Sequence, residues 1–292
     1  MRSNISVNIV SAHAEGEVGN VIVGGIPDPP GNDLWEMRTF IEKDQKLRNL
    51  LLNEPRGGVF KHINLLVKAK HPNAEFGFII MEPIHTPPMS GSNAICVATV
   101  LLETGLIKIE EPITSFNLDT PAGLIQVRAT CRDGEALKIE IQNVESFVDQ
   151  LNVPLKINGL GILNVNTAFG GDSFVLVDAS DCGLKIEPKS GDLIRNLGKE
   201  IIKAANEQLG FKHPVRNWNH ISFCQFTEPT LRTNNLLTGL SAVVIEPGKI
   251  DRSPCGTGCS ARMALLVSQG KMQKDDTFVG KSIIGGSFEC NL

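Results

Sequence analysis

The stretch DRSPCGTGCSARMALLVSQG, residues 251–270, places one cysteine at the start of a long apolar helical pattern. Cys255 lies between a proline and Gly-Thr-Gly, where that pattern begins. The N-terminus of a helix carries unpaired backbone N–H groups and a partial positive charge. We therefore expect a lowered pKa for Cys255, toward the thiolate that acts as a base or nucleophile. The flanking glycines would let an anionic ligand approach the same N–H groups.

A second stretch, SGSNAICVATVLLETG (residues 90–105), is built in the same way. When Ser90 is aligned with Cys255, four further pairs align: Gly91 with Gly256, Ser92 with Thr257, Leu101 with Leu266, and Gly105 with Gly270. This likeness predicts an internal duplication, with two similar halves that face each other across one site. The alternative is chance, because helix N-termini in general favour serine and glycine.

Composition excludes several classes of protein. The chain has 292 residues, of which 41% are hydrophobic and 21% charged, as in a soluble globular protein of one or two domains. A net charge of −4 and the absence of tyrosine argue against a nucleic-acid or anionic-membrane partner. The sequence contains no run of about 18 apolar residues, so no transmembrane helix is predicted. Seven scattered cysteines favour free thiols in a reducing cytoplasm.

Apolar periodicity predicts an α+β fold. Strands are expected at residues 5–11, 18–23, 63–67, 76–81, 123–130, 136–144, 166–177, 220–226 and 242–245. Helices are expected at 34–52 and 192–209, and the helices after Ser90 and Cys255 are apolar enough to be buried. We expect two pseudo-symmetric β-rich lobes, residues 1–120 and 121–292, each wrapped around its buried helix. The active site would lie in the cleft between them.

Two proton-transfer groups on opposite sides of a small ligand suit chemistry at the α-carbon of an amino acid. The substrate carboxylate would be held by helix N-terminal N–H groups, and Asp251 is placed to pair with a substrate ammonium. The amides in question belong to Gly91, Ser92, Gly256 and Thr257. No nucleotide-binding signature and no zinc-type ligand spacing occurs, so we expect neither a cofactor nor a metal. Cys259 could be a resolving thiol, although packing inside the helix is the simpler interpretation.

Several motifs together resemble the proline racemase family. DRSPCGTGCSARMA is similar to the second cysteine motif of that family, and HAEGE at residues 13–17 is similar to its N-terminal H-T-E-G-E signature. Further matches are EPRG at 54–57, DTPAG at 119–123, AFGG at 168–171 and NHI at 219–221. The resemblance extends through nearly the whole chain.

The resemblance implies a cofactor-independent enzyme of the diaminopimelate-epimerase-like fold, acting as a homodimer on proline-type amino acids. In the family, the residue at the position of Cys255 is a catalytic acid/base. The positions that line the substrate correspond here to Gly91, Ser92, His220, Asp251, Gly256 and Thr257.

The first motif departs from the family pattern, because Met89-Ser90-Gly91-Ser92 replaces M-C-G-H. A serine hydroxyl is a much poorer base than a thiolate, which argues against symmetrical proline racemisation. The leading hypothesis is dehydration of trans-3-hydroxy-L-proline, in which Cys255 removes the Cα proton and Ser90 helps the β-hydroxyl to leave. The alternatives are a 2-epimerase of 4-hydroxyproline or 3-hydroxyproline, and a non-catalytic binder of proline-like ligands. Family members continue beyond the position of Leu292, so we expect the final strands of the N-terminal lobe to be missing from this sequence.

Overall fold

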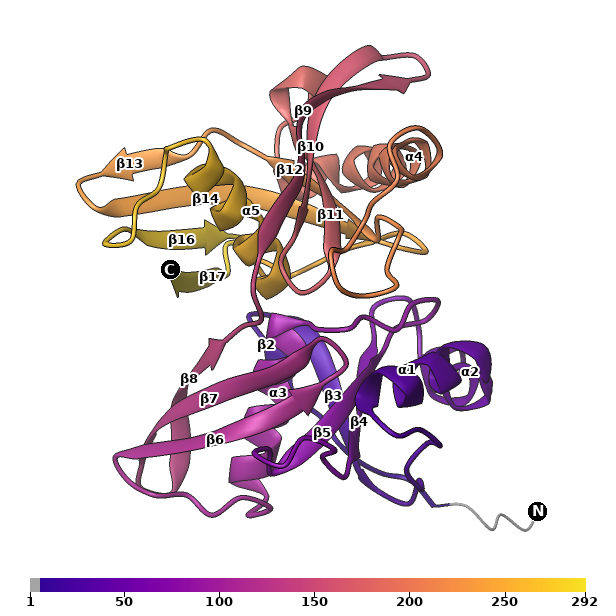
Figure 1. Ribbon diagram of the computed structural model, residues 1–292, viewed down its shortest axis with the longest axis vertical. Coiled ribbons are helices and arrows are strands. Elements are labelled where there is room, and N and C mark those ends of the chain that lie inside the picture. Colours follow the sequence, from indigo (N-terminus) through magenta and orange to yellow (C-terminus); the bar gives the residue numbers. More distant parts are fainter. Residues whose placement is uncertain (1–5) are drawn as a thin grey trace. The chain divides into compact units, whose positions relative to one another are not determined.

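The computed structural model describes residues 6–292 and divides into two compact units, Met1–Val144 and Glu145–Leu292 (Figure 1). The expected division after residue 120 falls in the turn between β6 (Ile113–Thr120) and β7 (Gly123–Arg132). Because β7 and β8 (Glu135–Gln142) extend the sheet of the first unit, the chain divides only after β8. No helix among the described residues is long and apolar enough to cross a membrane.

The first unit is a mixed sheet in the order β1-β3-β4-β5-β6-β7-β8, with β2 paired to β3. Its other strands are β1 (Asn8–Val10), β2 (His13–Ala14), β3 (Glu17–Gly24), β4 (His62–Val67) and β5 (Phe76–Met81). Helix α3 (Gly91–Glu103) contacts both β3 and β8, near opposite ends of that order, so the sheet curves around it. Helices α1 (Leu34–Lys43) and α2 (Lys46–Leu52) pack on the other face through a separate apolar cluster.

The second unit has a sheet in the order β17-β16-β14-β12-β11-β10-β9, with β13 and β15 paired to β14. Its strands are β9 (Phe147–Ile157), β10 (Gly161–Phe169), β11 (Ser173–Asp178), β12 (Phe223–Thr227), β13 (Leu231–Thr233), β14 (Leu236–Ile245), β15 (Lys249–Ile250), β16 (Thr277–Lys281) and β17 (Ser287–Asn291). Two short 3-10 turns, Ser180–Cys182 and Pro188–Ser190, precede α4 (Gly191–Gln208). Helix α5 (Gly256–Ser268) contacts β9, β10 and β11 at one end of the sheet and β17 at the other.

The two units repeat one topology, which confirms the predicted pseudo-symmetry. In the first, β3-α1/α2-β4 is a parallel crossover, β4-β5 an antiparallel hairpin, and β5-α3-β6 a second parallel crossover. In the second, β11-α4-β12, β12-β14 and β14-α5-β16 follow the same sequence of orientations. Helices α3 and α5 are therefore equivalent, and so are β4 and β12.

Some expected elements have different limits. The predicted helix 34–52 breaks at Asp44, whose backbone is extended and whose carboxylate accepts from the N–H of Lys46. The predicted strand 166–177 is two strands, because the chain turns between β10 and β11. The strand predicted at 5–11 is β1, Asn8–Val10, and Ile5 lies outside the described residues. Strands β2, β6, β9, β13, β15, β16 and β17 were not predicted.

Gly170, in the turn between β10 and β11, allows that turn to lie directly against the first turn of α5. A Cβ on Gly170 would be 2.0 Å from the carbonyl oxygen of Thr257 and 2.6 Å from the backbone nitrogen of Ala261. Both obstacles are backbone, so we expect Gly170→Ala to lower the free energy of unfolding by about 3 kcal/mol or more. Urea denaturation measures this change. Gly191→Ala is the control, because its Cβ would meet only Ile250 Cδ1 at 3.8 Å and should change stability little; equal effects of the two variants would refute the close approach.

Candidate active site

Ser90 is the N-cap of α3, and its side chain lies in a hydrogen-bonded cluster. Its Oγ accepts from Asn93 Nδ2 at 3.0 Å and, at a longer 3.5 Å, from the Asn93 backbone N–H. The hydroxyl of Ser92 lies 3.3 Å from the same Oγ. Ser90 is half-buried and Ser92 buried. Gly91 and Ser92 form the first turn of α3, where backbone N–H groups have no acceptor within the helix.

A buried polar network continues beneath Ser90. Asn93 Nδ2 lies 3.2 Å from His62 Nδ1, and Asn93 Oδ1 accepts from Asn64 Nδ2 at 2.9 Å. On its other side, His62 Nε2 lies 3.3 Å from Glu82 Oε1 and 3.8 Å from Glu17 Oε1. Each of these five residues is at most 2% exposed. Burying two carboxyl groups and an imidazole costs free energy unless they are paired. The hydrogen bonds and ion pairs within this cluster therefore offset the cost of keeping these groups away from water.

Cys255 is the N-cap of α5, and a short chain of hydrogen bonds fixes it. Asp251 Oδ1 accepts from the N–H and the hydroxyl of Ser253, and Ser253 Oγ accepts from the N–H of Cys255 at 3.1 Å. The sulfur lies 3.6 Å from Thr257 Oγ1. The backbone of Cys255 has φ 61° and ψ 99°, a conformation that residues other than glycine rarely adopt. Strained positions of this kind cluster at active sites.

The expected lowering of the Cys255 pKa is wrong for the protein without substrate. Burial, and then the negative charge of Asp251, raise the pKa of the thiol well above its ordinary value. Hydrogen bonds from Thr257 and from the backbone at Gly258 act in the opposite direction but are outweighed. Cys255 is 6% exposed, so water contributes little to solvating a thiolate there. The helix N-terminus alone does not make this thiol acidic.

Asp251→Asn should lower the pKa of Cys255, because it removes the second cause of the upward shift and keeps the side-chain oxygen that binds Ser253. We expect iodoacetamide to alkylate Cys255 at lower pH in this variant than in the wild type, as followed by peptide mass spectrometry. Asp192→Asn on α4 makes the same change in net charge at an exposed carboxylate and should not move the profile. A Cys255 profile that is the same in all three proteins would contradict the electrostatic role of Asp251.

An amide lies close to Cys255 inside the second unit. Gln225 on β12 is fully buried, and neither its Nε2 nor its Oε1 has a hydrogen-bond partner within the part of the chain described here. The position of a Cβ on Gly258 is 3.2 Å from Cys255 Sγ and 3.3 Å from Gln225 Nε2. A side chain at Gly258 would meet both groups, so its absence leaves a space that the amide and the sulfur both border.

His220 lies on the loop before β12. Its carbonyl accepts from the hydroxyl of Ser173 at 2.6 Å, and its ring packs on Trp218 with centroids 4.1 Å apart. The indole N–H of Trp218 donates to the same hydroxyl, so the loop is tied to the start of β11. Its contact with substrate stays a prediction.

The structure thus groups Ser90, Gly91 and Ser92 in the first unit, and Asp251, Cys255, Gly256 and Thr257 in the second. Sequence reasoning missed the polar residues behind them. A usable signal was present: His62 and Glu82 stand at the ends of the apolar runs INLLV and FGFIIM, and Gln225 interrupts the apolar strand FCQF. Polar residues at such positions are buried, and they then need partners.

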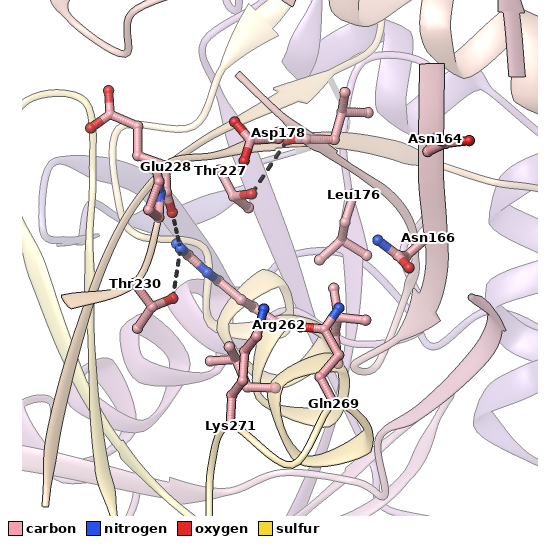
Figure 2. Close-up of a pocket in the computed structure, with 14 residues that line it drawn as sticks. Asn164, Asn166, Leu176, Asp178, Thr227, Glu228, Thr230, Arg262, Gln269 and Lys271 are labelled. Atoms are coloured by element: carbon pink, nitrogen blue, oxygen red, sulfur yellow. Dashed lines mark hydrogen bonds between the residues drawn. The ribbon is translucent and has the colours of Figure 1, made fainter. Parts of the chain in front are cut away.

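A separate pocket in the second unit lies beside the C-terminal half of α5, around Arg262 and Gln269 (Figure 2). None of the predicted site residues lines it. Arg262 is buried there and donates to the carbonyls of Leu240 and Glu228 and to the hydroxyl of Thr230. Burial lowers its pKa to about 10. These donors are engaged within the protein, so Arg262 has a structural role. Among residues 6–292, no group of three or more His, Cys, Asp or Glu side chains is arranged to hold a metal ion.

Comparison with known proteins agrees with this architecture. The model of the family described as proline racemase matches residues 9–292. A hydroxyproline epimerase from Agrobacterium vitis, solved with bound trans-4-hydroxy-L-proline, is 34% identical with a TM-score of 0.95, over 100% of this chain and 85% of that one. A probable proline racemase from Agrobacterium radiobacter K84, solved with bound carbonate, is 36% identical with a TM-score of 0.93, over 97% and 84% of the two chains. A methylitaconate-delta-isomerase, 13% identical with a TM-score of 0.51 over 98% and 87%, shares the fold alone.

Two repeats of one mixed sheet, each curved around a buried helix, define an α+β protein of the diaminopimelate-epimerase-like class. Within that class, the chain belongs to the proline racemase family, and it is an enzyme of the isomerase and epimerase type.

Proposed function

We propose that this enzyme breaks the Cα–H bond of a hydroxyproline without a cofactor, with Cys255 as the acid/base group. The observation that carries the proposal is the placement of Cys255: a strained N-cap on the buried helix of the second repeat, equivalent to Ser90 in the first. Family membership and the hydroxyproline epimerase among the similar structures support the substrate class. The proposal has Ser90 and Cys255 act on one substrate, whose carboxylate binds the N–H groups of Gly91, Ser92, Gly256 and Thr257.

Asp251 would receive the substrate ammonium. That positive charge would offset the carboxylate that keeps the pKa of Cys255 high, so substrate binding itself would favour the thiolate. His220 would complete the substrate pocket from the loop before β12.

The reaction that suits Ser90 best is dehydration of trans-3-hydroxy-L-proline. The Cys255 thiolate takes the Cα proton, the Cβ–O bond breaks, and the hydroxyl leaves as water with a proton from Ser90. The enamine then tautomerises to Δ1-pyrroline-2-carboxylate. The proton gained by Cys255 and the one lost by Ser90 balance through solvent, so no other reactant is needed.

A second candidate is 2-epimerisation of 4-hydroxyproline or 3-hydroxyproline, which the likeness to a hydroxyproline epimerase favours. In that reaction Ser90 would deliver its proton to Cα on the face opposite Cys255. An enzyme that carries out both reactions is compatible with the same pair of residues, because both begin with loss of the Cα proton.

Incubation in D2O with trans-3-hydroxy-L-proline, trans-4-hydroxy-L-proline and L-proline in turn, followed by NMR, distinguishes these reactions. We expect the 3-hydroxy substrate to disappear as the cyclic imine forms. Deuterium at an inverted Cα, without imine, would establish the epimerase in place of the dehydratase. Thermal stabilisation by these compounds without any exchange or product would overturn the proposal and leave a binding protein.

The family resemblance is the basis for a proposed oligomeric state, and the free thiols are the basis for a proposed location. We propose a cytoplasmic homodimer, for which sedimentation of the purified enzyme at the mass of two chains is the check.

A further inference from the structure

A backbone carbonyl fixes the direction of every hydrogen bond beneath Ser90. The carbonyl of Asn20 can only accept, and it lies 3.2 Å from one end of the Asn64 amide. That end must therefore be Nδ2. The same Nδ2 lies 2.9 Å from the Asn93 amide, so the Asn93 atom facing it must be the acceptor, Oδ1. The donor end of Asn93 is left to face Ser90 and His62.

The donor end of Asn93 determines where the protons of Ser90 and His62 lie. Ser90 Oγ accepts from Asn93 Nδ2, so the proton of Ser90 must point elsewhere, toward Ser92 Oγ at 3.3 Å or toward a bound substrate. His62 Nδ1 also faces this donor, so it must carry no proton. The proton of His62 is then on Nε2, next to the carboxylates of Glu82 and Glu17. Any reversal along this series would bring two donors or two acceptors together in a buried site, which is strongly unfavourable.

We propose that Ser90 is a proton donor and not a base, and that Asn93, held by Asn64 and His62, is the positioning residue that makes it so. The action of Ser90 on substrate rests on the function proposed above, but the hydrogen-bond directions do not. In this arrangement, Asn93 also stabilises the negative charge that develops on Ser90 Oγ as its proton leaves, because a donor already faces that oxygen.

The tautomer of His62 tests the direction of the network in the wild-type protein. The chain has six histidines, and their ¹⁵N and ¹H imidazole signals can be assigned by comparison with His62→Gln. We expect Nε2 of His62 to be protonated and Nδ1 to be bare. A proton on Nδ1 would reverse the series and overturn the proposal, whether or not the enzyme acts on hydroxyproline.

Asn93→Asp tests the effect on Ser90. The aspartate keeps the shape and still accepts from Asn64, but it draws the Ser90 proton toward itself, and His62 can protonate Nδ1 to meet the new acceptor. We expect product formation to fall by about 10²-fold, as for the loss of a general acid, while exchange of the Cα proton facing Cys255 continues in D2O. Ser90→Ala should show the same separation of exchange from turnover.

Asn206→Asp is the matched control. Asn206 also bridges two backbone segments, with its Nδ2 donating to Ile202 and its Oδ1 accepting from Ile221, but it lies in the second unit on α4. This variant should lose stability without changing the ratio of exchange to turnover. An unchanged ratio in folded Asn93→Asp would show that Asn93 only supports the fold.

The orphaned amide beside Cys255 carries a second inference. Gln225 on β12 corresponds to Asn64 on β4, because each amide lies beside the third residue after the N-cap of the buried helix: Asn64 beside Asn93, and Gln225 beside Gly258. Gly258, three residues after Cys255, occupies the place of Asn93, three residues after Ser90. We infer that Gln225 Nε2, reaching into the space above Gly258, donates to the Cys255 thiolate formed during the reaction.

Gln225→Met separates this role from a structural one. The methionine fills the same space but cannot donate, so iodoacetamide should alkylate Cys255 only at higher pH than in the wild type. The urea midpoint should hold or rise, because an unpaired buried amide has been removed. Leu176→Met, on the strand beside Gln225, controls for repacking and should leave the alkylation profile unchanged. A wild-type profile in Gln225→Met would overturn the inference.

Discussion

Cys255→Ser should reduce turnover of hydroxyproline by roughly 10³-fold or more and should abolish Cα exchange on the face that Cys255 serves. A serine hydroxyl fits the same N-cap, but its pKa is too high for it to take a proton from carbon at a useful rate. Initial rates by NMR or by imine absorbance measure the loss. Cys259→Ser, one turn further along α5, is the matched control: Cys259 is buried and its sulfur contacts the Pro254 carbonyl, so turnover should survive. Equal loss in both variants would mean that the defect is in folding.

The pH dependence of the wild-type enzyme follows from the same residue. The base is the thiolate, and the pKa of the thiol in the free enzyme is raised by burial and by Asp251. The fraction of active base therefore grows with pH, and kcat/KM should rise from neutral pH toward pH 9, because kcat/KM reports groups of the free enzyme. A kcat/KM that is flat over this range would contradict a high pKa for the catalytic base.

Much of the fold could be predicted because the chain repeats a pattern. The glycine-rich starts and apolar bodies of α3 and α5 predicted two equivalent buried helices, and both are present with 13 residues each. The missed strands include β9 and β17. Strand β9 has a mixed burial pattern without clean alternation. Strand β17 alternates between exposed and half-buried residues, but it is only five residues long and has no fully buried side chain. Strands β9 and β17 each pair with one neighbouring strand, β10 and β16, across a short turn, and the pattern of a single segment does not contain that partner.

The site shows a similar limit. Serine and cysteine at helix starts could be singled out from sequence because their neighbours are distinctive. The pKa of Cys255 could not, since its direction depends on burial and on the charge of Asp251, and both outweigh the helix N-terminus. The direction of the hydrogen bonds at Ser90 could not be predicted either. It depends on the Asn20 carbonyl through two amides from different elements. Residue type already favoured Ser90 as the group that helps the β-hydroxyl to leave, and the hydrogen-bond directions add a physical reason for it.

The free energy of unfolding should fall steeply at alkaline pH. Several thiols stay protonated in the folded protein at a pH where they ionise in the unfolded chain. Burial is the main cause that raises the pKa of Cys96 to about 12 and of Cys182 to about 11, and it raises the pKa of Cys224 well above its ordinary value of 9.0. Below pH 9 these thiols are protonated in both states, and they make no difference. Above it the unfolded chain loses protons that the folded chain retains, so the free energy of unfolding decreases as pH rises, until the folded thiols ionise as well.

Each such thiol should contribute a slope approaching about 1.4 kcal/mol per pH unit, which urea midpoints measured across this range would show. No tyrosine is present to titrate in the same interval, so ultraviolet absorbance follows thiolate formation directly. Cys224→Ala should make the slope shallower by one thiol. Val175→Ala, at the residue paired with Cys224 across β11 and β12, leaves a comparable space without removing a thiol. Val175→Ala should lower stability and leave the slope unchanged. Parallel curves for Cys224→Ala and the wild type would show that burial of the Cys224 sulfur does not contribute to the pH dependence.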